Sequence, residues 1–235
     1  MSITNLKPIT KDRTLRSNVA EQLREAIIRG DLTPGTKLTE SLLSSQLGVS
    51  RGPLREAIRQ LVDQGLVETI PYTGTYVANI SVQSIQELYT FRTEIEQFAF
   101  RLVWDQRTPE FYAEMKQQLD KLTKAIKEED RDATIIEELE LHNIVYKYCG
   151  HTLLQDTWKR LRGRLHLYFT LHQKAHNRSG PRVDAHDTYV ALACGDSLDL
   201  MLNHVKDHMQ QGYSKVEMLV GFIQESIDSS NAKAI

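Results

Sequence analysis

The chain has few cysteines and no long apolar run, and each absence excludes a class of protein. Its 235 residues contain two cysteines, Cys149 and Cys194, and no Cys-x-x-Cys pair, which excludes a disulfide framework. No apolar stretch reaches the roughly 18 residues that a bilayer span requires. The segment 1–12 is polar and lacks the apolar stretch of a signal peptide. We therefore expect a cytoplasmic protein with no membrane partner.

A strong positive charge is also absent, which limits how the chain can bind nucleic acid. The formal net charge is −2. Residues 1–78 hold ten Lys and Arg against eight Asp and Glu, whereas the remainder holds nineteen against twenty-three. Binding to nucleic acid must then depend on a few well-placed cations. The eight histidines all lie in the second part of the chain, at His142, His151, His166, His172, His176, His186, His204 and His208.

Helical periodicity and turn residues predict three helices in the first part. Residues 14–29 repeat apolar side chains on one face, and the Pro34-Gly35 turn follows. Thr39 begins a short second helix that Gly48 ends. Ser50 is a favoured N-cap for the third helix, where its hydroxyl could also donate to a phosphate. The second and third helices are spaced as in a helix-turn-helix.

After Gly65 the pattern changes from helix to strand. Residues 66–70 and 75–78 are β-prone, and the segment 71–74 between them predicts a hairpin turn. Three helices followed by a hairpin make a winged helix-turn-helix, which we assign to residues 1–78. The alternative is a plain interaction module, but arginines at the start of the third helix favour DNA binding.

The candidate DNA-reading residues lie at the start of the third helix. In a helix-turn-helix this end enters the major groove. Arg51 and Arg55 are four residues apart and share a face, so both can reach guanine or phosphate. Arg59 continues the face, and we expect it to contact the DNA backbone or a neighbouring carboxylate. The alternative for each arginine is a solvated surface charge.

The run LTESLLSSQLGVSRGPLREAIRQLVDQGLVETIPYTGTYV resembles the N-terminal domain of the GntR family of bacterial regulators. The resemblance covers residues 13–78. It implies DNA contacts at Ser50, Arg51, Gly52 and Arg55, with Gly74 in the wing. The sequence departs from the family in two places: Ser41 stands where arginine is common, and Tyr72-Thr73 precedes Gly74 where many relatives have an arginine.

From Ser81 onward the pattern is helical throughout. We predict helices near residues 82–102, 109–129, 133–148, 152–174, 182–193, 196–211 and 215–227. Residues 79–235 should therefore form an all-α antiparallel bundle, and the protein as a whole is mainly α. The first of these helices has an apolar stripe that we expect to be buried: Val82, Ile85, Leu88, Phe91, Ile95, Phe98 and Leu102.

Several histidines form i, i+4 pairs, which can share a metal ion. The pairs are Glu138/His142, Arg162/His166, His172/His176 and His204/His208. Polar helices produce such pairs by chance, so each is also compatible with an ordinary surface or core polar group. The pairs alone do not define a site.

The bundle resembles the FCD domain of the FadR subfamily, with the VanR-like branch as one candidate. Arg92 and Glu96 in FRTEIEQFA carry the resemblance, as do ELELH, which ends in His142, and AHDTYVALACGD, which contains His186. It implies a divalent metal, with Zn²⁺ first and Ni²⁺ or Mn²⁺ as alternatives. The implied ligands are Glu138, His142, His186 and His208. Glu138 replaces the family's aspartate, and His204 competes with His208.

Other polar groups on the same helices are candidates for holding an effector. They are Arg92, Arg162, Arg164, His166 and His204. Arginine forks suit a carboxylate. For the arginines and His166, salt bridges within the bundle or at a dimer interface are an equally good interpretation.

The sequence thus predicts a metabolite-responsive repressor. We expect a homodimer that binds a palindromic DNA operator and is released by a small organic acid bound at the metal site. One alternative is an activator, and another is a regulator for which the metal itself is the signal. A metalloenzyme is the remaining alternative, and it is disfavoured because no dedicated general base accompanies the histidines.

Overall fold

The structure is a computed structural model that describes residues 15–79, 81–176 and 183–214. The chain divides into two compact units, the first ending at Val77 and the second beginning at Ala78. Each unit is described separately.

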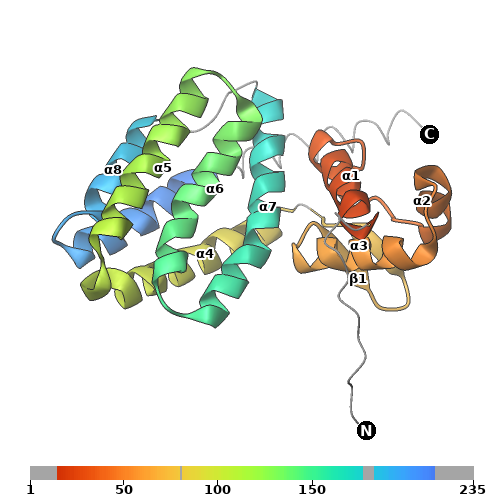
Figure 1. The fold of residues 1–235 in the computed structure, drawn as a ribbon, viewed down its shortest axis with the longest axis horizontal. Coiled ribbons are helices and arrows are strands. Elements are labelled where there is room, and N and C mark those ends of the chain that lie inside the picture. The colour runs from red at the N-terminus through yellow and green to blue at the C-terminus, as the bar shows by residue number, and fades with distance from the viewer. Residues whose placement is uncertain (1–14, 80, 177–182, 215–235) are drawn as a thin grey trace, which may run out of the picture. The chain divides into compact units, whose positions relative to one another are not determined.

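The first unit is a winged helix-turn-helix. It contains the helices α1 (Leu15–Arg29), α2 (Glu40–Leu47) and α3 (Arg51–Asp63), followed by the strands β1 (Val67–Ile70) and β2 (Gly74–Val77) (Figure 1). The strands pair antiparallel, with Val67 opposite Val77. The segment before α2 joins the edge of the hairpin, because the Leu38 N–H donates to the Thr75 carbonyl at 2.8 Å. Helix α3 buries Leu54, Ala57, Ile58 and Leu61.

The turn between α2 and α3 positions the start of α3. Gly48 ends α2 with φ of +64°, a left-handed conformation that glycine adopts without a Cβ clash. Ser50 occupies the N-cap position of α3 with extended backbone, but its side chain makes no cap hydrogen bond. The predicted capping role of the Ser50 hydroxyl is therefore wrong in this structure.

The second unit is helical. It contains α4 (Val82–Val103), a short 3-10 turn η1 (Trp104–Gln106), α5 (Pro109–Lys127), α6 (Arg131–Tyr148), α7 (Thr152–His176), α8 (Val183–Ala193) and a further helical stretch at residues 198–214. Helix α6 lies between α5 and α7 (Figure 1). Side chains cap the starts of α4, α5 and α6, at Ser81, Thr108 and Asp130. The helix predicted near 215–227 falls outside the described residues.

Helix α4 is rotated relative to the predicted apolar stripe. Val82, Phe91 and Phe98 are exposed by 41%, 47% and 41%, so the expectation that they are buried is wrong. The buried face of α4 instead includes Arg92 and Glu96. These two side chains form an ion pair, which allows charged residues to occupy the core face. Ile85, Leu88 and Ile95 of the predicted stripe are buried as expected, so apolar periodicity finds part of the core face and misses the two charged residues.

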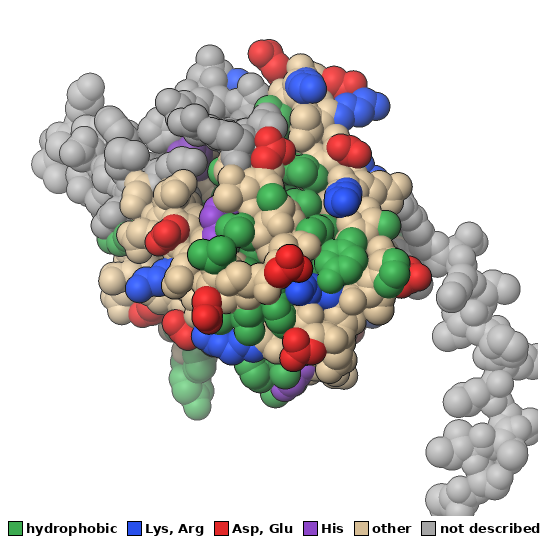
Figure 2. Space-filling model, turned by 90° about the vertical axis from the view of Figure 1, so that its left-hand side faces the viewer, with side chains coloured by type: hydrophobic (Ala, Val, Ile, Leu, Met, Phe, Trp, Pro, Cys, Tyr) green, Lys and Arg blue, Asp and Glu red, His purple; other side chains and the backbone are tan. Residues whose placement is uncertain are grey.

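The surface of the second unit mixes charges of both signs. On the face shown in Figure 2, acidic and basic side chains are interspersed with exposed apolar ones. Within the described residues, every helix is too short or too polar to cross a membrane.

Candidate nucleic-acid interface and candidate metal centre

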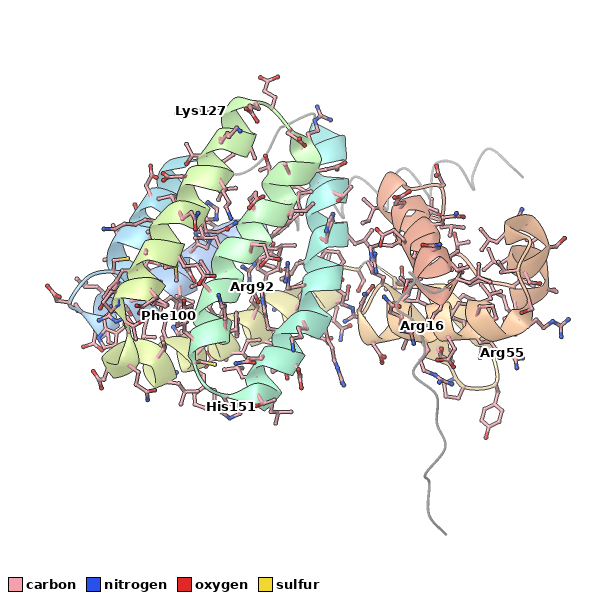
Figure 3. The ribbon with its side chains drawn as sticks, viewed as in Figure 1. Arg16, Arg55, Arg92, Phe100, Lys127 and His151 are labelled. Carbon is pink, nitrogen blue, oxygen red and sulfur yellow. The ribbon has the colours of Figure 1, made fainter. Side chains whose placement is uncertain are left out.

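Arg55 lies on the outer side of α3 and is held by a carboxylate from α2 (Figure 3). Its Nε donates to both Glu40 oxygens, at 3.0 and 2.8 Å. Glu40 is the first residue of α2, and the Arg55 side chain remains 62% exposed. Sequence analysis missed Glu40 because the pair spans fifteen residues across two helices. The acidic first turn of α2 was its only local signal.

The remaining predicted positions of α3 lie on the surface around Arg55. Ser50, Arg51 and Gly52 are exposed at its start. A Cβ at Gly52 would meet nothing within 4 Å, so the backbone there is open to close approach. Arg59 forms an exposed ion pair with Glu56 at 3.0 Å, which matches one of the two roles expected for it.

The wing carries a cation that the sequence did not predict. Gly74 has φ of +139°, a conformation that favours glycine, and a Cβ there would lie 2.9 Å from the Cε of the flexible Lys37 side chain. The Lys37 Nζ lies 5.7 Å from the centre of the Tyr76 ring. The Lys37 side chain therefore lies beside Gly74 in the hairpin.

Three histidines converge inside the helical unit. His142 comes from α6, His186 from α8 and His208 from the stretch 198–214, and one nitrogen of each lies within 4.8 Å of the others. The Glu138 Oε1 lies 3.6 Å from the His186 Nε2, although Glu138 is not part of the mutually close group. His204 is also outside the group, with its ring centre 5.8 Å from that of His208.

A buried carboxylate orients His142. The Glu96 Oε1 lies 2.8 Å from the His142 Nδ1 and also accepts a hydrogen bond from the Tyr189 hydroxyl at 2.8 Å. The Tyr146 hydroxyl donates to the other oxygen at 3.4 Å. A proton on Nδ1 leaves Nε2 as the lone-pair donor, and this atom is buried with no hydrogen-bond partner among the described residues. A carboxylate behind a histidine in this way is typical of metal ligands.

Burial keeps two histidines of this cluster, His142 and His208, neutral. It holds the pKa of His142 and of His208 well below the usual histidine range, and the neighbouring Arg92 and histidines lower the pKa values further. The neutral ring is the form that binds metals. Burial also raises the pKa of Glu96, an effect that the Arg92 guanidinium opposes.

The low pKa values predict that the metal-free protein loses stability in mild acid. His142 and His208 stay neutral when folded but take up protons near pH 6.5 when unfolded, so the unfolded state binds more protons and stability falls as the pH drops below about 6.5. Two such groups give a slope of up to about 2.7 kcal/mol per pH unit. Urea unfolding of chelator-treated protein at several pH values measures this slope of the unfolding free energy against pH. A His208→Gln variant should roughly halve the slope, and an unchanged slope would contradict this assignment.

The donor set fits a divalent transition metal. Nitrogens bound to one tetrahedral Zn²⁺ at about 2.1 Å lie about 3.4 Å apart. The three histidine nitrogens, which lie within 4.8 Å of one another, would therefore have to approach by up to about 1.4 Å on binding. Three imidazoles with a nearby carboxylate suit Zn²⁺, Ni²⁺ or Mn²⁺. The residues present could therefore hold such an ion.

Arg92, like His204, is a predicted effector residue that lies beside the cluster. Its side chain is 2% exposed, and its Nη2 is buried with no hydrogen-bond partner among the described residues. The guanidinium lies 5.4 Å from the centre of the Trp158 ring; Figure 3 labels Arg92 among the helices of this unit. Arg162 instead forms an ion pair with Glu140. Arg164 and His166 are only partly buried on α7.

The two units match two known families. Residues 15–77 match the family described as "Bacterial regulatory proteins, gntR family", and residues 87–211, more than half of the chain, match the one described as "FCD domain". Together with the winged helix-turn-helix, these matches define a DNA-binding transcription regulator. The chain belongs to the GntR family, in the group that carries an FCD domain.

Individual relatives extend over both units. The gluconate operon transcriptional repressor of Bacillus licheniformis is 25% identical over 206 residues, which are 86% of this chain and 84% of the relative. The transcriptional repressor GlaR of Escherichia coli is 32% identical over 139 residues, which are 57% of this chain and 63% of the relative. The structure of E. coli McbR/YncC has the same fold, with a TM-score of 0.70 and 22% identity over 87% of this chain and 98% of that one.

Proposed function

We propose that this protein is a cytoplasmic, metabolite-responsive repressor. It binds a palindromic operator as a homodimer and releases it when a small organic acid binds beside a metal ion in the helical unit. The observation that supports the metal and effector site is the buried His142 Nε2. This atom has no partner among the described residues and lies in the cluster shared with His186 and His208. The similarity to known repressors supports the proposed repression of transcription through DNA binding.

The reading face consists of Ser50, Arg51, Gly52 and Arg55. The exposed start of α3 enters the major groove, where an arginine fork can bind guanine and the open backbone at Gly52 can approach a phosphate. Lys37 and Gly74 bring the wing to the DNA backbone, with Lys37 supplying the positive charge. A two-fold dimer presents two such faces to a palindrome.

The ligand site would be positively charged. His142, His186 and His208 would hold the metal, with Glu138 as a fourth ligand or as a hydrogen-bond partner of His186. A divalent ion bound there, preferably Zn²⁺, would supply fixed positive charge. Arg92 adds a buried guanidinium whose Nη2 has no partner among the described residues, so a carboxylate would be stabilised by both groups. This charge distribution favours an organic acid as the effector.

Native mass spectrometry with elemental analysis of the purified protein tests the proposal. We expect a dimer that carries one divalent metal ion per chain. Titration of a DNA-bound sample with candidate organic acids should then lower operator affinity, and linkage requires DNA to lower acid affinity by the same factor. A protein whose DNA affinity follows the metal alone, with no response to any acid, would be a metal sensor instead.

A further inference from the structure

Glu40 is an acidic residue in a place where acid is unfavourable for DNA binding. It starts α2 and faces Arg55 on the exposed side of α3, beside the residues proposed to enter the major groove. A carboxylate there repels phosphates and neutralises a nearby arginine. An acidic residue at this position therefore calls for an explanation, and the geometry of the Glu40–Arg55 pair offers one.

Glu40 engages only one part of the Arg55 guanidinium. Both recorded hydrogen bonds use the Arg55 Nε, at 3.0 and 2.8 Å. An arginine side chain has five N–H donors, and four of them belong to the two Nη groups at its end. The Nη pair is the fork that addresses guanine O6 and N7. The carboxylate thus binds the Nε side of the guanidinium, and the two Nη groups stay available to bind a base in the major groove.

We infer that Glu40 is a positioning residue for DNA reading: it fixes the Arg55 side chain so that the Nη fork meets a guanine, at the expense of general affinity for phosphate. An untethered Arg55 on this exposed surface could turn toward the nearest phosphate, because its long side chain has many rotamers. Restraining it before binding reduces the entropy lost on contact with a base. The inference rests on the proposed role of Arg55.

The test compares sequence-specific with non-specific binding by full-length variants. The specific probe is a duplex selected from a randomised library by the wild-type protein, and the non-specific probe is a scrambled duplex of the same composition. We expect Glu40→Ala to lower the ratio of the two affinities by about tenfold, within the 1–3 kcal/mol that one arginine–guanine contact contributes. Its affinity for the scrambled duplex should rise by up to about fivefold, since a surface charge contributes at most about 1 kcal/mol.

Two further variants separate positioning from charge and from folding. Glu40→Asp retains the charge and the favourable acid at the start of α2 but is one methylene shorter, so it should also lower the ratio, without the gain on scrambled DNA. Glu56→Gln removes the partner of Arg59 on the same helix, and it should leave the ratio unchanged. Thermal melting within a few degrees of the wild type confirms that each variant is folded.

A double variant shows whether Glu40 acts through Arg55. Glu40→Ala added to Arg55→Ala should change the ratio no further than Arg55→Ala does alone. If Arg55→Ala lowers the ratio but neither Glu40 variant does, Glu40 is only a link between α2 and α3, and the inference is overturned while the proposed function stands. If Arg55→Ala itself leaves the ratio unchanged, the proposed reading role of Arg55 fails.

Discussion

We expect Arg55→Ala to weaken operator binding strongly and to leave the protein folded. In the proposed dimer the variant would remove two reading contacts, one at each half-site, and each is expected to contribute about 1–3 kcal/mol. The sum of about 2–6 kcal/mol corresponds to a loss of roughly 30-fold to 10⁴-fold in affinity. The fold survives because Arg55 is 62% exposed and its ion pair with Glu40 contributes at most about 1 kcal/mol to stability.

A gel-shift assay at fixed salt concentration, together with thermal melting, measures both parts of this prediction. Arg55→Lys should lower operator affinity nearly as much as Arg55→Ala does, because a lysine has no Nε to bind Glu40 and no planar guanidinium to bind guanine. Lys37→Ala is the contrasting variant: it should weaken binding to all sequences alike and reduce the slope of log K against log salt by about one. Nanomolar operator affinity in Arg55→Ala would remove Arg55 from the reading face.

Local signals in the first unit were strong enough to predict its fold. Gly48 and Gly65 mark positions of positive φ that end helices, and the hairpin turn before Gly74 has few alternatives. Such local signals could not predict the Glu40–Arg55 and Lys37–Gly74 contacts. They join residues fifteen and thirty-seven positions apart, and only the packing of α2 and the hairpin brings them together.

In the second unit, prediction from the sequence failed for a different reason. Apolar periodicity found the helices but only part of the buried face of α4. Ile85, Leu88 and Ile95 of the predicted stripe are buried, and the paired charges of Arg92 and Glu96 are buried on the same side. The ligand candidates came from resemblance to a family, since histidines on three separate helices have no common spacing in sequence. The hydrogen bond from Tyr189 to Glu96, which spans 93 positions, could not be predicted in either way.

His208→Ala is expected to remove metal binding and effector response while leaving DNA binding intact. His208 is the least buried of the three clustered histidines, so its truncation disturbs the core least. With Zn²⁺ at about 100 times its dissociation constant, the wild type gains about 2.7 kcal/mol of stability. For a unit of this size that is a rise of about 5–10 °C in melting temperature, which the variant should lack.

Two matched histidine variants make the assignment specific. His204→Ala changes a histidine one turn away that lies outside the mutually close group, and it should retain the metal and the rise in melting temperature. His151→Ala changes a histidine packed on Phe98, away from the cluster, and serves as the control for histidine loss in the same unit. If His204→Ala loses the metal and His208→Ala keeps it, the ligand set is His142, His186 and His204.

Glu138→Gln then decides how the carboxylate acts. As a direct ligand, Glu138 must be charged, and the amide should weaken metal binding by more than the 10- to 100-fold typical of a residue that only orients a ligand. As a partner of His186, the amide oxygen can still accept a hydrogen bond from the ring, and the loss should stay within or below that range. Either result retains the three-histidine site, whereas an unchanged affinity would remove Glu138 from it. If the proposed mechanism holds, the effector response should fall in the same order as metal affinity, because the acid would be stabilised by the bound metal beside Arg92.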